Sequence, residues 1–257
     1  MHRATLLRCL LAASLMAGGI APACATWSIA VVNPHTGTIG VAAASCSGGV
    51  WGIQSVVPGR GVVIVQAASN RDARNAAVRM MRDGAPLDTI LAHLVDPASG
   101  YDPADQQIAL LASGPDARAR THTGADVPDV STQSGGTFFT VQGNTLASSE
   151  VVRRAAAALG KPGWRDDLDM AKALLLALQG VAKAGGDRRC GASASNTALL
   201  SLHRATDPAD APWVSLSVNR IPTGAASGTD ALTELFEDWQ RNGRLRPSTA
   251  IFVVPRT

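Results

Sequence analysis

The stretch Thr26–Val32 (TWSIAVV) decides the fold, because its β-branched and apolar residues predict a buried strand from its first position onward. A turn over 33–37 (NPHTG) follows, with proline and glycine where the chain must reverse. Residues 38–44 return as a second strand. The sequence therefore predicts a β-hairpin over 26–44, and the remaining elements are expected to assemble around it.

The rest of the chain alternates between blocks of strands and blocks of helices. Strands are expected at 61–68, 106–113, 118–123, 136–142, 196–203, 213–219 and 248–254, and helices at 71–82, 86–95, 148–159, 166–184 and 229–242. Strands joined by short turns are antiparallel. We therefore expect one α+β domain over 26–257, with two antiparallel sheets packed face to face and helices outside; an open α/β sheet is the less favoured alternative.

Residues 1–25 have the organisation of a secretory signal peptide: a basic start, an apolar run and the small-residue ending Ala23-Cys24-Ala25. A membrane anchor is less favoured because the apolar run is short. A lipoprotein signal with a lipidated Cys24 is less favoured because the three residues before it match that motif poorly. We expect an exported protein, periplasmic or secreted, with no membrane span after cleavage.

The composition excludes several classes of protein. With 46% hydrophobic and 17% charged residues among 257, the chain is expected to fold rather than to stay disordered. A net charge of +3 does not provide the basic face of a nucleic-acid-binding protein. Metal-ligand spacings, phosphate loops, dinucleotide fingerprints and the Gly-x-Ser-x-Gly motif are all missing from the sequence. We expect no nucleic-acid partner, no metal and no cofactor, whereas a homo-oligomer is compatible with the composition.

Cleavage after Ala25 would make Thr26 the first residue and would place its hydroxyl and its α-amine at the start of a strand. A hydroxyl is a weak nucleophile that needs a nearby base. An α-amine, with an ordinary pKa of about 7.7–8.0, can be that base near neutral pH. This is the N-terminal threonine form of acyl transfer. Many exported proteins begin with threonine by chance, so the terminus alone leaves a catalytic role open.

Two glycine-rich loops, 46–52 and 184–191, each carry one cysteine. An oxidising compartment favours a disulfide between Cys46 and Cys190, and two free thiols with thiol chemistry are the alternative. Asp187 and its neighbours form either a shaped loop or a solvated one. Asn144, at a strand end, belongs either to a simple turn or to an oxyanion site.

Several stretches together resemble the family known as domain of unknown function 1028, which is grouped with the N-terminal nucleophile (Ntn) hydrolases. The matching stretches are 26–30 (TWSIA), 40–45 (GVAAAS), 55–58 (SVVP), 61–70, 141–146 (VQGNTL) and 185–189 (GGDRR). The resemblance implies a four-layer αββα sandwich and a catalytic threonine at the position of Thr26. Where the family often has lysine and glycine, this chain has Cys46 and Cys190, which fits a disulfide added in an exported member.

The hypothesis that follows is an exported hydrolase that cleaves an amide C–N bond in a small-molecule or peptide-like substrate, with Thr26 as nucleophile and its α-amine as base. The supporting groups expected are Asn144 and backbone N–H groups for the oxyanion, Ser45 for the amine or the nucleophile, Asp187 and Arg188 for the terminus or the substrate, and Gln66 and Asn70 for the walls of the cleft. The alternative is a non-catalytic exported binding or accessory protein, associated with fimbriae or with the cell envelope.

Overall fold

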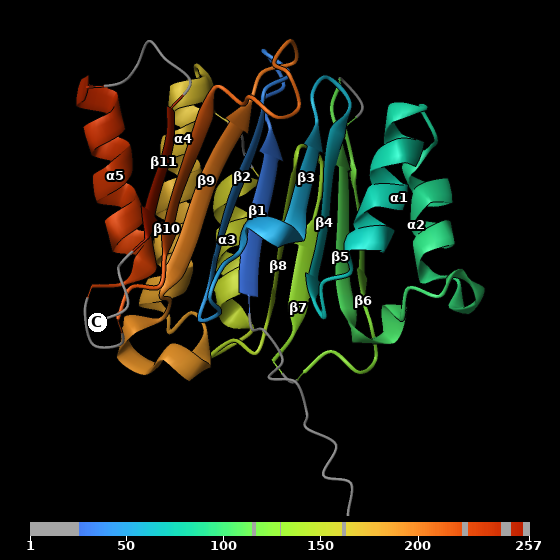
Figure 1. The fold of residues 1–257 in the computed structure, drawn as a ribbon, viewed down its shortest axis with the longest axis horizontal. Coiled ribbons are helices and arrows are strands. Elements are labelled where there is room, and N and C mark those ends of the chain that lie inside the picture. The colour runs from blue at the N-terminus through green and yellow to red at the C-terminus, as the bar shows by residue number, and fades with distance from the viewer. Residues whose placement is uncertain are drawn as a thin grey trace, which may run out of the picture.

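The computed structural model describes residues 26–114, 117–128, 130–160, 163–222, 226–242 and 248–253. The expected signal peptide, 1–25, lies outside these residues. The described chain folds into two β-sheets and five α-helices, whose arrangement is shown in Figure 1.

The larger sheet contains the expected N-terminal hairpin at its centre. Its seven strands lie in the order β11 (Ser248–Val253), β10 (Val214–Asn219), β9 (Thr197–His203), β2 (Ile39–Ser45), β1 (Thr26–Val32), β8 (Phe139–Asn144) and β7 (Thr132–Gly135). Neighbouring strands are antiparallel except β10 and β11, which are parallel. That exception follows from their connection, because helix α5 (Gly228–Asn242) crosses over between them.

The smaller sheet has four antiparallel strands in sequence order: β3 (Gln54–Val57), β4 (Gly61–Ala67), β5 (Gln106–Ala112) and β6 (Ala119–Thr123). Helices α1 (Arg71–Arg82) and α2 (Leu87–Val95) lie between β4 and β5 in the chain. Helices α3 (Glu150–Leu159) and α4 (Asp167–Lys183) follow β8. The α+β class with two sheets is therefore as expected, and both sheets are antiparallel except for the edge pair β10 and β11.

Three apolar clusters show how these elements are layered. One cluster lies between the two sheets and includes Val41 and Ile64. A second packs the larger sheet, through Trp27 among others, against α3, α4 and α5. A third packs the smaller sheet against α1 and α2, with Ile90 in its middle. The layers therefore run helices, sheet, sheet, helices, as can be followed across Figure 1.

Strand β1 has no exposed residue, and its two faces belong to different layers. Trp27, Ile29 and Val31 pack with the helices, whereas Ala30 and Val32 pack between the sheets. Because side chains alternate along a strand, Thr26 and Ser28 also face the layer between the sheets. The end of β1 therefore brings polar side chains into that layer.

Two strands were not expected, and a third is shifted. β3 has only four residues and follows a glycine-rich loop, so its apolar content is too small for a pattern. β7 (TQSG) has no apolar alternation and is held by backbone pairing with β8. The strand expected at 136–142 forms at Phe139–Asn144 instead, which puts Asn144 inside the sheet.

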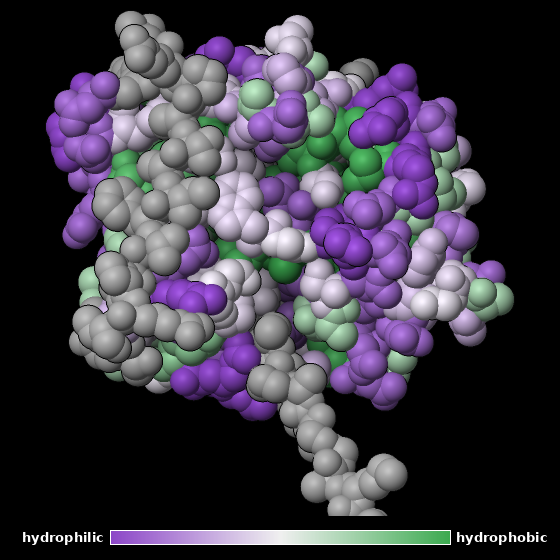
Figure 2. All heavy atoms as spheres, in the orientation of Figure 1, coloured by the Kyte–Doolittle hydropathy of each residue, from purple (hydrophilic) through white to green (hydrophobic). Residues whose placement is uncertain are grey.

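Polar side chains cover much of the face seen in Figure 2, most densely over α1 and α2. Leu176 is the large hydrophobic residue that stands out as exposed, at 68%. None of the helices in the described ranges is both long enough and apolar enough to cross a bilayer.

His203, at the end of β9, gives the fold a specific pH dependence. Burial lowers the pKa of this imidazole to about 4, and the nearby Asp207 opposes the shift. Between about pH 6.5 and 4 the unfolded chain binds a proton that the folded chain does not, so stability falls as the pH falls through this window. The contribution is about 3 kcal/mol, from roughly 1.4 kcal/mol per pKa unit.

We predict that His203→Asn reduces the loss of unfolding free energy between pH 7 and pH 4 by about 2–3 kcal/mol. Urea unfolding at pH 7, 5.5 and 4 measures this. His35→Asn, in an exposed turn, is the matched control. Equal pH dependence in the wild type and in His203→Asn would show that another group is responsible.

Candidate functional site

A row of polar residues crosses the larger sheet at the end of β1. Thr26 is paired in register with Ser45 of β2 on one side and with Asn144 of β8 on the other. Ser45 is in turn paired with Thr197 of β9. Residues directly opposite one another in an antiparallel pair direct their side chains to the same face. The N-terminal hairpin and two strands distant from it in the sequence, β8 and β9, therefore place four polar side chains in a line.

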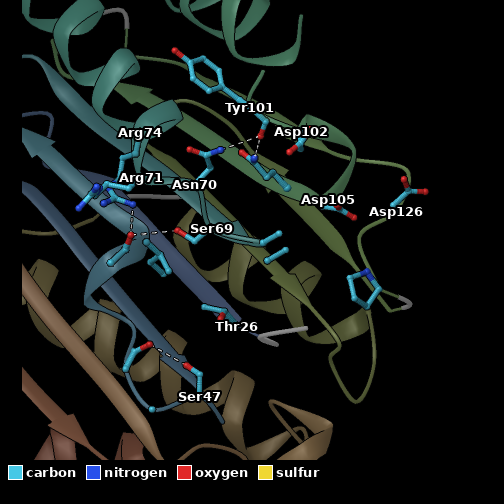
Figure 3. Close-up of a pocket in the computed structure, with 18 residues that line it drawn as sticks. Thr26, Ser47, Ser69, Asn70, Arg71, Arg74, Tyr101, Asp102, Asp105 and Asp126 are labelled. Atoms are coloured by element: carbon cyan, nitrogen blue, oxygen red, sulfur yellow. Dashed lines mark hydrogen bonds between the residues drawn. The ribbon is translucent and has the colours of Figure 1, made fainter. Parts of the chain in front are cut away.

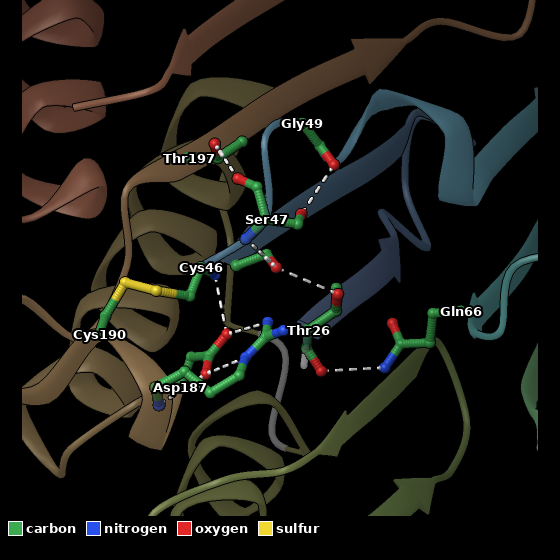
Figure 4. Close-up of polar contacts among 10 residues, drawn as sticks. Thr26, Cys46, Ser47, Gly49, Gln66, Asp187, Cys190 and Thr197 are labelled. Carbon is green, nitrogen blue, oxygen red and sulfur yellow. Dashed lines mark hydrogen bonds and ion pairs between the residues drawn. A yellow bond between two sulfur atoms is a disulfide. The ribbon is translucent and has the colours of Figure 1, made fainter. Parts of the chain in front are cut away.

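Two buried glutamines of the smaller sheet hold this row from across the layer. Gln66 and Gln107 are paired in register, and Gln66 Nε2 donates to Gln107 Oε1 at 2.9 Å. Gln66 Nε2 also donates to the Thr26 carbonyl at 3.2 Å, and Gln66 Oε1 accepts from Ser28 Oγ at 2.5 Å. Gln107 Oε1 accepts from Asn144 Nδ2 at 3.2 Å. Figure 4 shows Gln66 directed toward Thr26.

The same row fixes the start of the glycine-rich loop 46–52. Thr26 Oγ1 lies 3.4 Å from Ser45 Oγ, a long contact. Ser45 Oγ accepts from the Ser47 N–H at 3.0 Å, and Thr197 Oγ1 donates to the Ser47 carbonyl at 2.8 Å. The loop therefore leaves the sheet beside the Thr26 hydroxyl, with both backbone groups of Ser47 held by the row.

Asp187 is fully buried and connects the second glycine-rich loop to the first. Its carboxylate accepts from the Cys46 N–H at 2.8 Å, and it pairs with the Arg189 guanidinium, with Nη2 at 2.8 Å and Nε at 3.1 Å. Gly186, just before it, has a φ of +45° and approaches the Trp27 ring, so only a glycine fits there without strain. The loop therefore delivers a charged pair to the end of β2.

The expected disulfide between Cys46 and Cys190 is present, with 5.6 Å between the two Cα atoms. It ties together the two loops that Asp187 also joins (Figure 4). Since both thiols are used in the bond, the alternative of thiol chemistry at these positions is wrong for this structure.

A cavity of about 1150 Å³ opens next to the polar row. It is lined by Thr26, the glycine-rich loop residues Ser47 to Gly49, Gly52 and Ile53, residues 67–71 and Arg74, residues Tyr101, Asp102, Asp105 and Gln106, and Asp126 and Pro128. Thr26 is only 2% exposed, so it contributes a small part of the cavity surface (Figure 3). Apart from Thr26, the polar row supports the cavity rather than lining it.

Three non-glycine residues next to the polar row and to Asp187 have positive φ angles. They are Ala67, at the end of β4, Thr145, directly after Asn144, and Ala194, whose carbonyl accepts from the Asp187 N–H. Their φ angles are 66°, 51° and 57°. Such positions cost about 1–3 kcal/mol each and concentrate at functional sites. Their grouping here favours this end of the sheets as the functional region.

The structure brings most of the expected site residues together, but some lie in the buried hydrogen-bonded group and others at the cavity or on the surface. Thr26, Ser45, Asn144 and Gln66 form one hydrogen-bonded group. Asp187 joins it through the Cys46 backbone. Asn70 lines the cavity and also caps α1, because its Oδ1 accepts from the N–H groups of Asp72 and Ala73. Arg188 is exposed, and it is Arg189 that binds the carboxylate of Asp187.

Several residues around the site were not predicted from the sequence: Ser28, Gln107 and Gln142 between the sheets, Arg189 at Asp187, and Arg74 at the cavity wall. For the first three, the sequence does contain a signal: each is a polar residue within a segment that is expected to form a buried strand, so its side chain must find a hydrogen-bond partner there. Over the described ranges, no three His, Cys, Asp or Glu side chains gather as a metal site. The polar row beside the cavity offers hydroxyl, amide and backbone N–H groups, and the cavity wall adds the guanidinium groups of Arg71 and Arg74 and exposed carboxylates.

The neighbouring arginines of the second loop allow a matched test. We predict that Arg189→Ala lowers the free energy of unfolding by about 2–4 kcal/mol, because it leaves the buried Asp187 carboxylate without its charged partner. Arg188→Ala should change it by less than about 0.5 kcal/mol, because the Arg188 side chain forms no ion pair or hydrogen bond with the described residues. Urea unfolding of both variants, with the disulfide intact, measures the difference. Equal costs would mean that the charged pair contributes nothing specific.

Comparison with known proteins agrees with this architecture. The structure of protein SPO2555 from Silicibacter pomeroyi, described under the family model DUF1028, matches with a TM-score of 0.68 and 22% sequence identity, over 86% of this chain and 91% of that one. At this identity the match establishes the fold alone. No curated protein resembles the chain significantly. The model of the family of unknown function DUF1028 matches residues 26–226, and the chain therefore belongs to that family.

Proposed function

We propose that this protein is an N-terminal nucleophile hydrolase that cleaves an amide bond, with Thr26 as the nucleophile after the chain is cut before it. The observation that carries the proposal is the position of Thr26. It is held in register between Ser45 and Asn144 at the edge of the cavity. The layer order of helices, sheet, sheet, helices supports the same assignment.

The reaction would proceed in two steps. The Thr26 oxygen attacks the substrate carbonyl, the α-amine takes the hydroxyl proton, and the same proton passes to the departing amine as the C–N bond breaks. Water then attacks the resulting ester and releases the acid, with the α-amine again transferring the proton. In the uncut chain the nitrogen of Thr26 is an amide and cannot act as this base, so cleavage before Thr26 creates the base beside a hydroxyl that is already in place.

Asn144 is well placed to hold the new amine. Its Nδ2 is engaged by Gln107, whereas its Oδ1 is buried and has no hydrogen-bond partner among the described residues. A buried acceptor without a donor is unfavourable, and we propose that the α-amine formed on the paired residue Thr26 turns to donate to it. Asn144 is itself fully buried, so we assign it to positioning the amine rather than to the oxyanion.

The oxyanion would be bound by the glycine-rich loop. Gly48 and Gly49 line the cavity together with Thr26, and both residues are exposed. Glycine lets a substrate approach the backbone closely, and backbone N–H groups are effective donors to an oxyanion. The contacts of Ser47 with Ser45 and Thr197 fix this loop in place before substrate arrives.

We also propose that the protein is exported and that removal of residues 1–25 is the cut that exposes Thr26. The leader pattern of the sequence supports export, and the Cys46–Cys190 disulfide is compatible with an oxidising compartment. Processing and catalysis would then depend on the same peptide bond, between Ala25 and Thr26.

The test is acylation by a strained acyl donor, a β-lactone, whose ring opens when a hydroxyl attacks its carbonyl. The full chain is expressed with its leader in a bacterial host, and its N-terminus is read by intact mass. We predict a mature start at Thr26 and a β-lactone adduct on that residue. Thr26→Ala should abolish the adduct, whereas Thr26→Ser, which keeps a hydroxyl and an amine, should retain it.

One control tests the contribution of the α-amine separately from that of the hydroxyl. A glycine inserted between Ala25 and Thr26 keeps the side chain but moves the free amine one residue away, and we expect acylation to slow by about 10²–10⁴-fold. Acylation of a different residue, undiminished acylation of the glycine-inserted chain, or a mature start elsewhere with no adduct would overturn the proposal. The last outcome would favour the non-catalytic accessory role.

A further inference from the structure

Arg74 is a buried arginine for which the fold supplies no counter-ion. It lies in the first half of α1, is 9% exposed, and lines the cavity that Thr26 also lines. No carboxylate of the described residues forms an ion pair with it; its neighbour Arg71 reaches only Asp72, at 4.0 Å. Arginine stays protonated in proteins, so a positive charge remains uncompensated at the cavity wall.

The hydrogen bonds of Arg74 are also incomplete. Nη1 donates to the carbonyl of Gly52 in the glycine-rich loop. Nε is buried with no partner, and Nη2 has none within the described part of the chain. A guanidinium carries five N–H donors in a planar fork that matches a carboxylate. The contact with Gly52 therefore accounts for only part of what this side chain can bind.

The surroundings make the positive charge more unfavourable. Burial and the adjacent Arg71 both lower the pKa of Arg74. The two arginines also occupy the first turns of α1, where the helix dipole favours negative charge. A purely structural residue at this position would be expected to be neutral or acidic. An anion bound here would relieve all three penalties.

The other charged residues of the cavity do not neutralise Arg74. Asp102, Asp105 and Asp126 are exposed and lie on the other side of the view in Figure 3. Figure 3 also shows Arg71 and Arg74 together on the wall formed by α1, with Thr26 below them. One side of the cavity is thus positive and partly desolvated, while the acidic side is open to water and screened.

We propose that Arg74, assisted by Arg71, binds a carboxylate group of the ligand that enters this cavity. The ligand class is a carboxylate-bearing amide, such as an N-acyl amino acid, rather than a neutral amide. The identification of this ligand as the substrate rests on the proposed function. Binding of the carboxylate itself does not, because it requires neither a free amine nor a reactive hydroxyl at Thr26.

The test compares two probes of nearly the same size and shape, N-acetyl-L-alanine, which carries a carboxylate, and N-acetyl-L-alaninamide, which carries a neutral amide in its place. Their dissociation constants are measured by calorimetry or NMR on the full chain as purified, in a Thr26→Ala background so that nothing is turned over. We expect the carboxylate to bind about ten- to a hundred-fold more tightly than the amide, as is typical of hydrogen bonds to a charged group.

Three variants assign that preference. Arg74→Gln should bring the ratio of the two dissociation constants close to one. Arg79→Gln, on the same helix but away from the cavity lining, should leave it unchanged. Because Arg74 also holds the Gly52 carbonyl, Arg71→Glu is the second test should Arg74→Gln fail to fold. Arg71 is a surface side chain, 80% exposed, and reversing its charge should lower the ratio several-fold.

The outcomes separate this proposal from the catalytic one. Equal binding of both probes by the parent protein, or an unchanged ratio in a folded Arg74→Gln variant, overturns carboxylate recognition even if amides are hydrolysed. If Arg74→Gln does not fold, an unchanged ratio of the two dissociation constants in Arg71→Glu overturns carboxylate recognition instead. A clear preference that depends on Arg74, together with no acylation of Thr26, supports the binding site and removes the hydrolase.

Discussion

The packing of the two sheets at the candidate site depends on one constraint: the fully buried amide side chains of Gln66 and Gln107 must find all of their hydrogen-bond partners between the sheets. A buried amide with an unmade hydrogen bond costs about 1–3 kcal/mol, so the strands cannot shift without breaking several bonds at once. Gln66 holds Thr26 and Ser28, and Gln107 holds Asn144. The two sheets are thereby locked in register at the point where the cavity opens.

This constraint explains why the candidate site is polar at the end of an apolar sandwich. Farther along β1, the same layer is filled by Ala30 and Val32 with the apolar side chains around them. At the end near Thr26, hydroxyl and amide groups replace them. Ala67 and Thr145, which have positive φ angles, also lie at this polar end, so the strained backbone and the buried hydrogen-bond network occur in the same place.

The sequence was sufficient for the hairpin, the helices and the layer order, because alternation and helical periodicity are local patterns. It was insufficient for β7, whose pairing with β8 has no apolar signature. Nor could it decide between Arg188 and Arg189, because that choice depends on the turn imposed by Gly186. Burial of Arg74 was equally out of reach, since it depends on how the loop around Gly52 passes over α1, an encounter between segments distant in the chain.

Strand β1 has a hydrogen-bonded neighbour on each side, and this has a consequence for how the molecule moves. Backbone amides at the centre of a sheet exchange with solvent only in rare, large openings, so we expect the backbone of β1 to be among the slowest-exchanging parts of the fold. The facing wall is secured differently, by Arg74 and Ser69 donating to the single carbonyl of Gly52. We therefore expect the wall around Gly52 to fluctuate more than the backbone of β1, so that this wall governs the entry and exit of a ligand.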